Sequence, residues 1–254
     1  MTIPILPCQT IGDVIARLDQ VIECCINERS RLGYFAALYR NVTVRVRDAI
    51  AASRFEDGPR MERLDVIFAN RYLDALDRFW RGQQPPTSWS VAFHAARRWR
   101  PVIFQHMLLG MNAHINLDLA IAAAQTSPGS DLPGLKRDFQ EITILLGEMI
   151  DSVQERIDQV SPWFRIIDYV GGRTDEQVCA FAIKIARNLA WKAAEELAVA
   201  APDKYKQEIA SHDQIVAELG RKIQSPGRLV RAALYLVRVR ESNQVPVVIE
   251  ALRL

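Results

Sequence analysis

Apolar residues recur every three or four positions along nearly the whole chain, which is the spacing of amphipathic helices. Thr10 is placed as the N-cap of the first helix, predicted over 11–29. In the second, over 35–49, Val42, Val44 and Val46 alternate like a strand, but the longer helical pattern runs through them without a turn signal. The same reasoning predicts further helices from the turn at 56–59 to 80, then over 89–99, 101–125, 135–160, 203–221 and onward from 225–226.

Proline, glycine and capping residues mark where the predicted helices begin and end. Thr174 and Gln177 form a capping-box pattern that opens another helix after Gly171 and Gly172. Pro246 is expected to interrupt the C-terminal tail. No internal repeat and no long linker divides the chain, so we predict one all-α domain over 1–254 with about nine or ten helices.

Composition limits the compartment and the partners. The 254 residues are 49% hydrophobic and 24% charged, as in an ordinary folded protein. Lys and Arg number 32 and Asp and Glu 30, so no overall field favours nucleic acid, and we expect no nucleic-acid partner. Residues 1–9 lack the basic start and long apolar run of a secretory signal, and the four cysteines form no Cys-x-x-Cys pair. We therefore expect a cytoplasmic protein without disulfides or structural zinc.

The segment 101–125 is the most apolar long stretch of the chain, yet it carries six polar side chains. Three of them, His106, His114 and Asp118, are ionisable, which makes a membrane span too costly. A helix with no polar face is normally buried on all sides. We therefore predict a multi-helix bundle with this helix buried at its centre.

Two polar stripes run along the central helix. At about 100° per residue, Met107, His114 and Ile121 fall near one line, with Gly110 and Asp118 about 40° away. The opposite side carries Gln105, Asn112 and Asn116. These groups either hydrogen-bond neighbouring helices and only specify packing, or His114 and Asp118 form a proton-transfer pair on a cavity wall. In the second case the carboxylate fixes the imidazole tautomer and raises its basicity toward neutrality.

The functional interpretation makes His114 and Asp118 catalytic residues that act on a small, largely apolar molecule. His106 lies two turns before His114 and could reach the same cavity, and methionine side chains suit an irregular apolar ligand. Arg187 and Trp191 share a helix face and could hold a substrate carboxylate. The predicted substrate-binding residues are His106, Met107, Met111, Asn112, Asn116, Arg187 and Trp191.

The segment Leu109–Leu119, LGMNAHINLDL, resembles the signature of a bacterial helical family catalogued as a domain of unknown function (number five-nine-nine-five). Other segments that fit the same pattern are Arg63–Asp65 with Phe68 and Tyr72–Leu73, Asp168 with 172–176, and Ala186–Arg187 with Ala190–Trp191. The resemblance covers roughly 58–197. It implies a helical fold and a site region around the motif, and it brings no established activity.

The spacing His114-x-x-x-Asp118 is also similar to part of the zinc motif of helical phospholipase C and single-strand nuclease families. Those families ligate several zinc ions with many histidines, whereas this chain has only four, so a trinuclear site is excluded. We expect no metal and no cofactor, and a single ion held by His114, Asp118 and other carboxylates stays as an alternative. The candidate carboxylates, expected mostly on solvated helix faces, are Asp65, Asp138, Glu141, Glu148, Asp151 and Asp168.

Two classes of function remain open from the sequence. One is an enzyme that performs acid–base chemistry on a small lipophilic metabolite, with the single-metal hydrolase as a variant. The other is a non-catalytic binding or scaffold protein in which the polar residues are structural. A pocket on the order of a few hundred Å³ beside His114 would distinguish them. The oligomeric state is not predicted.

Overall fold

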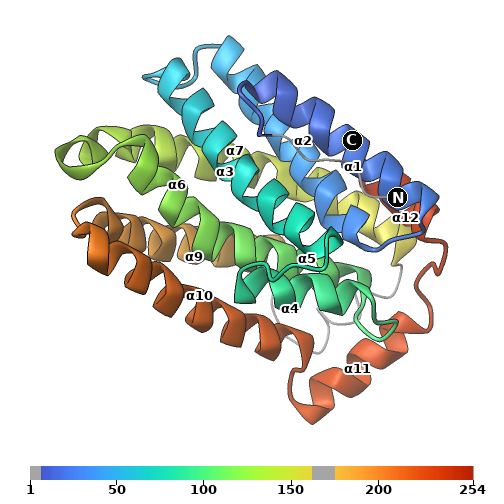
Figure 1. Ribbon diagram of the computed structural model, residues 1–254. Helices are drawn as coiled ribbons and strands as arrows, with labels where there is room; N and C mark the ends of the chain where they lie inside the picture. Colours follow the sequence, from blue (N-terminus) through green and yellow to red (C-terminus); the bar gives the residue numbers. More distant parts are fainter. Residues whose placement is uncertain (1–6, 162–174, 254) are drawn as a thin grey trace.

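The computed structural model describes residues 7–161 and 175–253, and every regular element in these ranges is a helix (Figure 1). The predicted all-α fold is therefore confirmed. In chain order the elements are α1 (Ile11–Asn27), α2 (Leu32–Ala51), α3 (Gly58–Trp80), α4 (Thr87–Ala96), α5 (Ile103–Ala113), η1 (His114–Asp118), α6 (Leu119–Thr126), η2 (Gly129–Asp131), α7 (Leu132–Val160), α9 (Asp175–Ala198), α10 (Pro202–Gln224), α11 (Arg228–Arg238) and α12 (Val245–Leu252).

The start of α1 follows from capping chemistry that the sequence shows. The Thr10 hydroxyl accepts the N–H of Asp13, and the Asp13 carboxylate accepts the N–H of Thr10, so α1 begins with a capping box. The alternating valines of the second helix lie within α2, as predicted. Helix α4 is shorter than the predicted 89–99 and covers Thr87–Ala96.

Two predicted helix boundaries involve Pro246 and Thr174. The prediction that Pro246 interrupts the C-terminal tail is wrong, because Pro246 lies in the first turn of α12. The N–H groups of a first turn have no partner within the helix, so proline costs nothing there. Thr174, the expected cap of the helix that is now α9, lies outside the described residues.

The central helix is a continuous rod made of α5, η1 and α6, and it is buried as predicted (Figure 1). By length and composition Ile103–Thr126 could cross a membrane, but 78% of its apolar window is buried inside the molecule, as in the core helix of a folded protein. Met107 and Leu109 belong to a core shared with α1–α4 and α12, while Leu119 and Ile121 belong to a second core with α7 and α9. The turn η1 therefore lies where the two cores meet.

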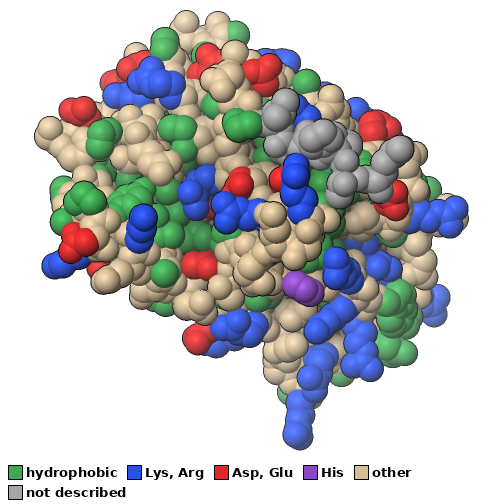
Figure 2. Space-filling view, viewed as in Figure 1, with side chains coloured by type: hydrophobic (Ala, Val, Ile, Leu, Met, Phe, Trp, Pro, Cys, Tyr) green, Lys and Arg blue, Asp and Glu red, His purple; other side chains and the backbone are tan. Residues whose placement is uncertain are grey.

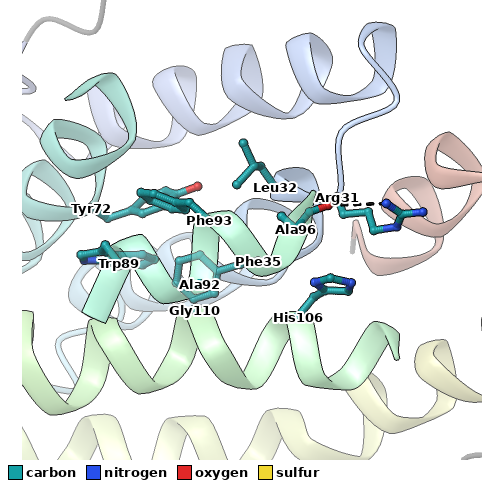
Figure 3. A pocket seen from close by; sticks show the side chains of 10 residues that line it. All are labelled: Arg31, Leu32, Phe35, Tyr72, Trp89, Ala92, Phe93, Ala96, His106 and Gly110. Atoms are coloured by element: carbon teal, nitrogen blue, oxygen red, sulfur yellow. Dashed lines mark hydrogen bonds between the residues drawn. The ribbon is translucent and has the colours of Figure 1, made fainter. Parts of the chain in front are cut away.

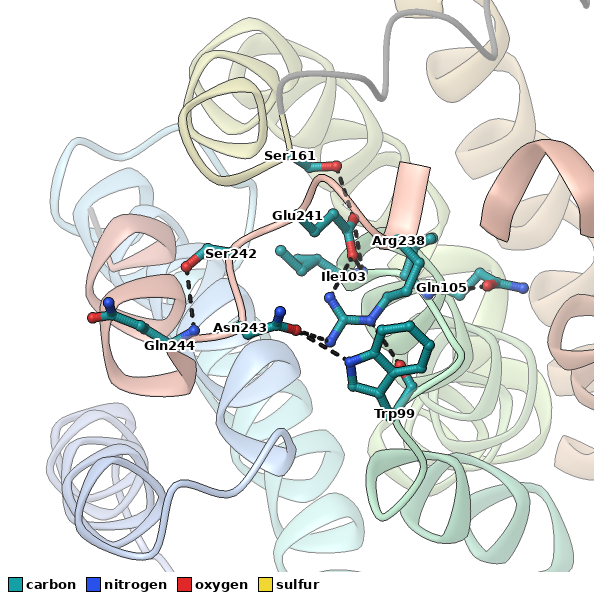
Figure 4. A network of polar contacts seen from close by, with 10 residues as sticks. Trp99, Ile103, Gln105, Ser161, Arg238, Glu241, Ser242, Asn243 and Gln244 are labelled. Atoms are coloured by element: carbon teal, nitrogen blue, oxygen red, sulfur yellow. Dashed lines mark hydrogen bonds and ion pairs between the residues drawn. The ribbon is translucent and has the colours of Figure 1, made fainter. Parts of the chain in front are cut away.

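A buried carboxylate from the C-terminal region caps the start of the rod (Figure 4). Both oxygens of Glu241 accept the N–H of Ile103 at 3.1 Å, and the Ser161 hydroxyl donates to the same carboxylate at 2.8 Å. Arg238 lies 3.4 Å from Glu241 and packs over the Trp99 ring at 5.0 Å. A negative charge at a helix N-terminus is stabilising, so this network fixes where the rod begins.

Helix α11 extends away from the packed helices at the lower edge of the molecule (Figure 1). Its side chains at Val237 and Arg238 are buried, whereas Leu229 is 88% exposed and Leu236 57%. Lys and Arg side chains gather over it in the space-filling view (Figure 2). This helix is therefore attached mainly through its C-terminal end.

Candidate functional site

A π-helical turn interrupts the central rod, and it contains both residues of the predicted catalytic pair. The turn is His114–Asp118, and the N–H of Leu119 reaches back to the carbonyl of His114. Such turns are rare and occur frequently at functional sites. A uniform helical repeat, on which the sequence-based prediction rests, does not contain such a turn.

Asp118 is completely buried and connects three elements. Its Oδ1 accepts a hydrogen bond from Arg71 Nε of α3 at 3.0 Å. Its Oδ2 accepts from Trp89 Nε1 of α4 at 2.8 Å and from His114 Nδ1 at 3.2 Å. The predicted contact between His114 and Asp118 is therefore present. Arg71 and Trp89 were not among the predicted site residues, because only the fold brings them to this carboxylate.

The bond to Asp118 also fixes the state of the imidazole. A carboxylate can only accept, so His114 Nδ1 carries the proton and Nε2 of the neutral ring is an acceptor. That Nε2 is buried and has no hydrogen-bond partner among the described residues. Burial lowers the pKa of His114 more than the Asp118 charge raises it, and the charge of Arg71 lowers it further. The ring is therefore neutral at pH 7, and its pKa is not restored to neutrality as the sequence suggested.

Five aromatic side chains surround the His114 ring and are called the aromatic cage here: Phe35, Tyr39, Phe68, Tyr72 and Trp89. Phe68 stacks on His114 with the ring centroids 3.5 Å apart, and Tyr39 meets it edge-on at 4.4 Å. Phe68 and Tyr72 of α3 belong to the family pattern recognised in the sequence. The other three cage residues, Phe35 and Tyr39 of α2 and Trp89 of α4, were not predicted for the site. His114 is 3% exposed, so the cage encloses it almost completely.

Two further polar atoms near the cage lack partners among the described residues, namely Tyr39 Oη and Asp65 Oδ2. Asp65 lies one turn before Phe68 on α3. The pKa of Tyr39 is raised mainly by burial and further by the charge of Asp65. Burial raises the pKa of Asp65 to about 7. The expectation of solvated carboxylates is therefore wrong for Asp65, and also for Asp138, which is buried where it accepts the N–H of Glu56 at the start of α3.

A small cavity lies beside the aromatic cage (Figure 3). Phe35, Tyr72 and Trp89 of the cage line it together with Phe93, His106 and Gly110. Its volume is about 20 Å³, which is room for about one water molecule. This cavity is much smaller than the pocket of about a few hundred Å³ that was expected beside His114, and His114 does not line it.

Phe35 separates this cavity from His114. Its ring lies against Gly110, where an added Cβ would fall 2.5 Å from two ring carbons. The same ring meets His114 at 5.6 Å between centroids. Both ring nitrogens of His106 lack a partner among the described residues, and burial lowers the pKa of His106 to about 3. Phe35 therefore contacts the neutral His114 and lines the same cavity as the neutral His106.

The remaining predicted ligand-binding residues lie elsewhere. Asn112 donates to the Val216 carbonyl of α10, and Asn116 donates to Asn112, so this stripe faces α10 and not His114. Met107 is a buried core residue, and Met111 packs partly buried against the same core. None of these contacts reaches the His114 ring.

Arg187 and Trp191 of α9 form a separate cluster with α7. Arg187 donates to the Phe139 carbonyl at 2.6 Å and lies 4.2 Å over the Phe139 ring. Trp191 packs edge-on against Phe139 and donates to Glu195. Their hydrogen-bonding groups are engaged in these contacts, so the structure does not bring them together with His114.

The histidines are too far dispersed to build a metal centre within the described residues. They contain no group of three or more His, Cys, Asp or Glu side chains that could hold an ion. His94 contacts Ser90, and His212 contacts the Asn116 carbonyl. The oxygens of Asp118 are already taken by Arg71, Trp89 and His114. The single-metal alternative therefore finds no ligand set here.

Comparison with known proteins gives one match. No curated protein and no solved structure matches the chain. A family profile matches residues 11–226, a longer span than the 58–197 that the sequence motif suggested. The chain belongs to a family of unknown function, DUF5995.

Proposed function

We propose that this protein binds a small, largely apolar molecule beside the aromatic cage and that His114 exchanges a proton with it. The observation that carries the proposal is the buried, unpartnered Nε2 of an imidazole whose Nδ1 is held by Asp118. Buried polar atoms without partners are few in folded proteins, and each calls for an explanation such as a catalytic role or a bound molecule. The π turn at the same two residues supports a functional explanation.

Asp118 is a positioning residue in this proposal. Its hydrogen bond holds the proton on Nδ1, so Nε2 is available as a base. Arg71 and Trp89 hold the carboxylate in turn, which prevents the imidazole from rotating. The cage lowers the local dielectric and favours an uncharged, apolar partner molecule.

Access requires a movement of Phe35. The cavity beside His106 holds about one water, and Phe35 lies between it and His114. Because Phe35 lines the cavity and also contacts His114, rotation of its ring would open the cavity toward His114. The Phe35, Tyr72, Trp89 and Phe93 rings would then line an apolar site with His114 and His106 as its polar groups.

The second candidate function is a non-catalytic scaffold, and a specific observation favours it. Asp118 alone ties α3, α4 and η1 together, and the packing around His114 leaves no room for a metabolite without movement. In this case the buried network only specifies how the helices pack.

Proton exchange distinguishes the two candidates. Small lipophilic ketones such as acetophenone and cyclohexanone are incubated with the protein in D₂O, and deuterium incorporation is followed by mass spectrometry. The proposal predicts exchange by the wild type and a loss on the order of 10²–10⁴ in rate for His114→Phe. This variant keeps a ring stacked on Phe68 but removes one donor to the buried Asp118, so its melting temperature is measured beside the exchange rate.

Ala92→Leu is the matched variant for binding, because Ala92 lines the cavity and its side chain forms no hydrogen bond to Asp118. It should fill the cavity and abolish exchange while His114 stays intact. Exchange that persists in both variants, or no exchange of any ketone by the wild type, would favour the scaffold.

A further inference from the structure

A groove of about 340 Å³ lies on the surface outside the buried network. It runs between α3 and α10 and is bounded by the residues that precede α4. Arg71 lines this groove and also donates to Asp118, so it connects the groove to the buried site. The volume falls within the range of small-molecule sites, about 300–1,000 Å³.

Three cations line the groove: Arg71, Arg78 and Lys206. Asp118 takes only the Nε of Arg71, and no other hydrogen bond of this guanidinium is formed within the described ranges. Lys206 is exposed and forms no ion pair with a described residue. Arg78 is half-exposed and pairs with Asp74, which does not line the groove. The groove therefore offers several unused N–H donors.

One carboxylate also lines the groove, and its charge is offset. Asp213 accepts the N–H of Thr87 at 2.6 Å and the N–H of Ser88 at 2.9 Å, at the first turn of α4. A helix N-terminus carries partial positive charge, which balances such a carboxylate. Arg71 and Arg78 are paired with Asp118 and Asp74, but neither of these carboxylates lines the groove. The groove wall itself therefore presents three cationic side chains and one hydrogen-bonded carboxylate.

The uncharged lining is mostly apolar: it comprises Pro85, Pro86, Leu117, Ile209 and Ala210, together with the polar residues Gln84 and Thr87. On the face viewed in Figure 2, Lys and Arg side chains lie next to apolar surface where Figure 1 places α3 and α6. A free inorganic anion would use only the cations, and a neutral lipid would use only the apolar wall. A molecule with one anionic group and an apolar body uses both.

We propose that this groove binds a small organic anion, a carboxylate or phosphate on an apolar body, through Arg71, Arg78 and Lys206. The proposal does not depend on the proton exchange by His114. It adds a link to that site, because an anion that draws the Arg71 guanidinium toward the groove weakens its bond to Asp118. His114 would then lose a nearby positive charge and become more basic.

The test is a calorimetric titration of the full chain with phenyl phosphate, benzoate, inorganic phosphate and phenol. We expect phenyl phosphate or benzoate to bind at least tenfold more tightly than inorganic phosphate and phenol. Whichever of phenyl phosphate and benzoate binds more tightly identifies the anionic group as a phosphate or a carboxylate. Equal affinity for phenyl phosphate and inorganic phosphate, or no heat from any probe at millimolar concentration, would overturn the proposal.

Two arginines of α3 provide a matched pair of variants. Arg78 and Arg81 each pair with an aspartate four residues earlier, at 2.8 and 2.7 Å, and are 49% and 50% exposed. Only Arg78 lines the groove. Arg78→Gln should weaken binding about tenfold, the value of one charge-assisted hydrogen bond, and Arg81→Gln should not. Equal losses in both variants would show attraction by net charge and would refute the site.

Lys206 is a second exposed residue of the groove, and Lys206→Gln should weaken binding by the same amount as Arg78→Gln. Arg71→Gln should abolish binding, but it leaves a buried carboxylate short of a partner, so its melting temperature is measured beside it. Nitrogen-15 shifts of the His114 ring report the link: they should move when the anion binds to the wild type. Shifts that stay unchanged at saturation would overturn the link.

Discussion

The contact between Phe35 and Gly110 decides how His114 is enclosed, and Gly110→Ala tests it. A Cβ at this position would lie 2.5 Å from two carbons of the Phe35 ring and 2.9 Å from its Cβ. The whole side chain must therefore move, and not only its far end. Phe35 is held by Tyr72, Trp89 and His114, with ring centroids 5.1, 5.5 and 5.6 Å away. Overpacking of this kind costs about 1–3 kcal/mol, and we expect the upper half of that range.

Gly147→Ala is the control for helix propensity. Gly147 lies within α7, and an added Cβ would meet nothing within 4 Å. Replacing glycine with alanine there should stabilise the protein by about 1 kcal/mol. Gly110→Ala gains the same propensity but also carries the overpacking term, so the two variants should differ by about 2–3 kcal/mol.

Urea unfolding followed by circular dichroism at a helix wavelength measures this difference. For a domain of this size it corresponds to about 4–12 °C in melting temperature. Equal stabilities for the two alanine variants would mean that Phe35 does not lie on Gly110. The separation of the cavity from His114 would then be wrong as well.

Three further predictions test other parts of the structure. Asp65 has a pKa of about 7 when folded and about 3.9 when unfolded, so its contribution to stability is full below pH 4 and is lost as pH rises to 7. The free energy of unfolding of Asp65→Asn, measured by urea unfolding, should therefore rise by up to about 4 kcal/mol relative to that of the wild type between pH 4 and pH 8. A difference between the two proteins that does not change with pH would contradict this. Glu241→Ala leaves Arg238 buried without its partner and should cost about 3–5 kcal/mol, with Glu241→Gln costing less because it still accepts from Ile103. Burial lowers the pKa of His106 to about 3, so as the pH falls the unfolded chain takes up a proton at this residue before the folded chain does. The free energy of unfolding should therefore fall by about 2 kcal/mol from pH 6.5 to pH 5, and His106→Phe should remove this loss.

The sequence predicts the helices well because their signals are local. The Thr10 and Asp13 pair at the start of α1 and the apolar period of the central rod lie within a few residues of the structure they specify. The helical wheel also separates the two polar stripes correctly: His114 faces the cage, and Asn112 faces α10. These features depend on spacing alone.

The site is less predictable because its contacts join distant parts of the chain. Arg71 and Trp89 reach Asp118 from 47 and 29 residues away, and no local pattern marks either one. The π turn breaks the helical repeat on which the wheel relies. Asp65 resembled a solvated helix-face charge, and only packing shows that it is buried. Long-range packing therefore supplies what periodicity cannot.

The central claim is that His114 presents a bare, neutral Nε2 while Asp118 holds the proton on Nδ1. Nitrogen-15 spectra of the imidazole rings at pH 7, assigned with His114→Phe, measure this directly. The structure predicts a neutral ring with Nδ1 protonated and Nε2 unprotonated, and the proposed function predicts that the Nε2 signal shifts when a ketone that exchanges deuterium is added. A ring protonated on Nε2, or an imidazolium at pH 7, would contradict the claim.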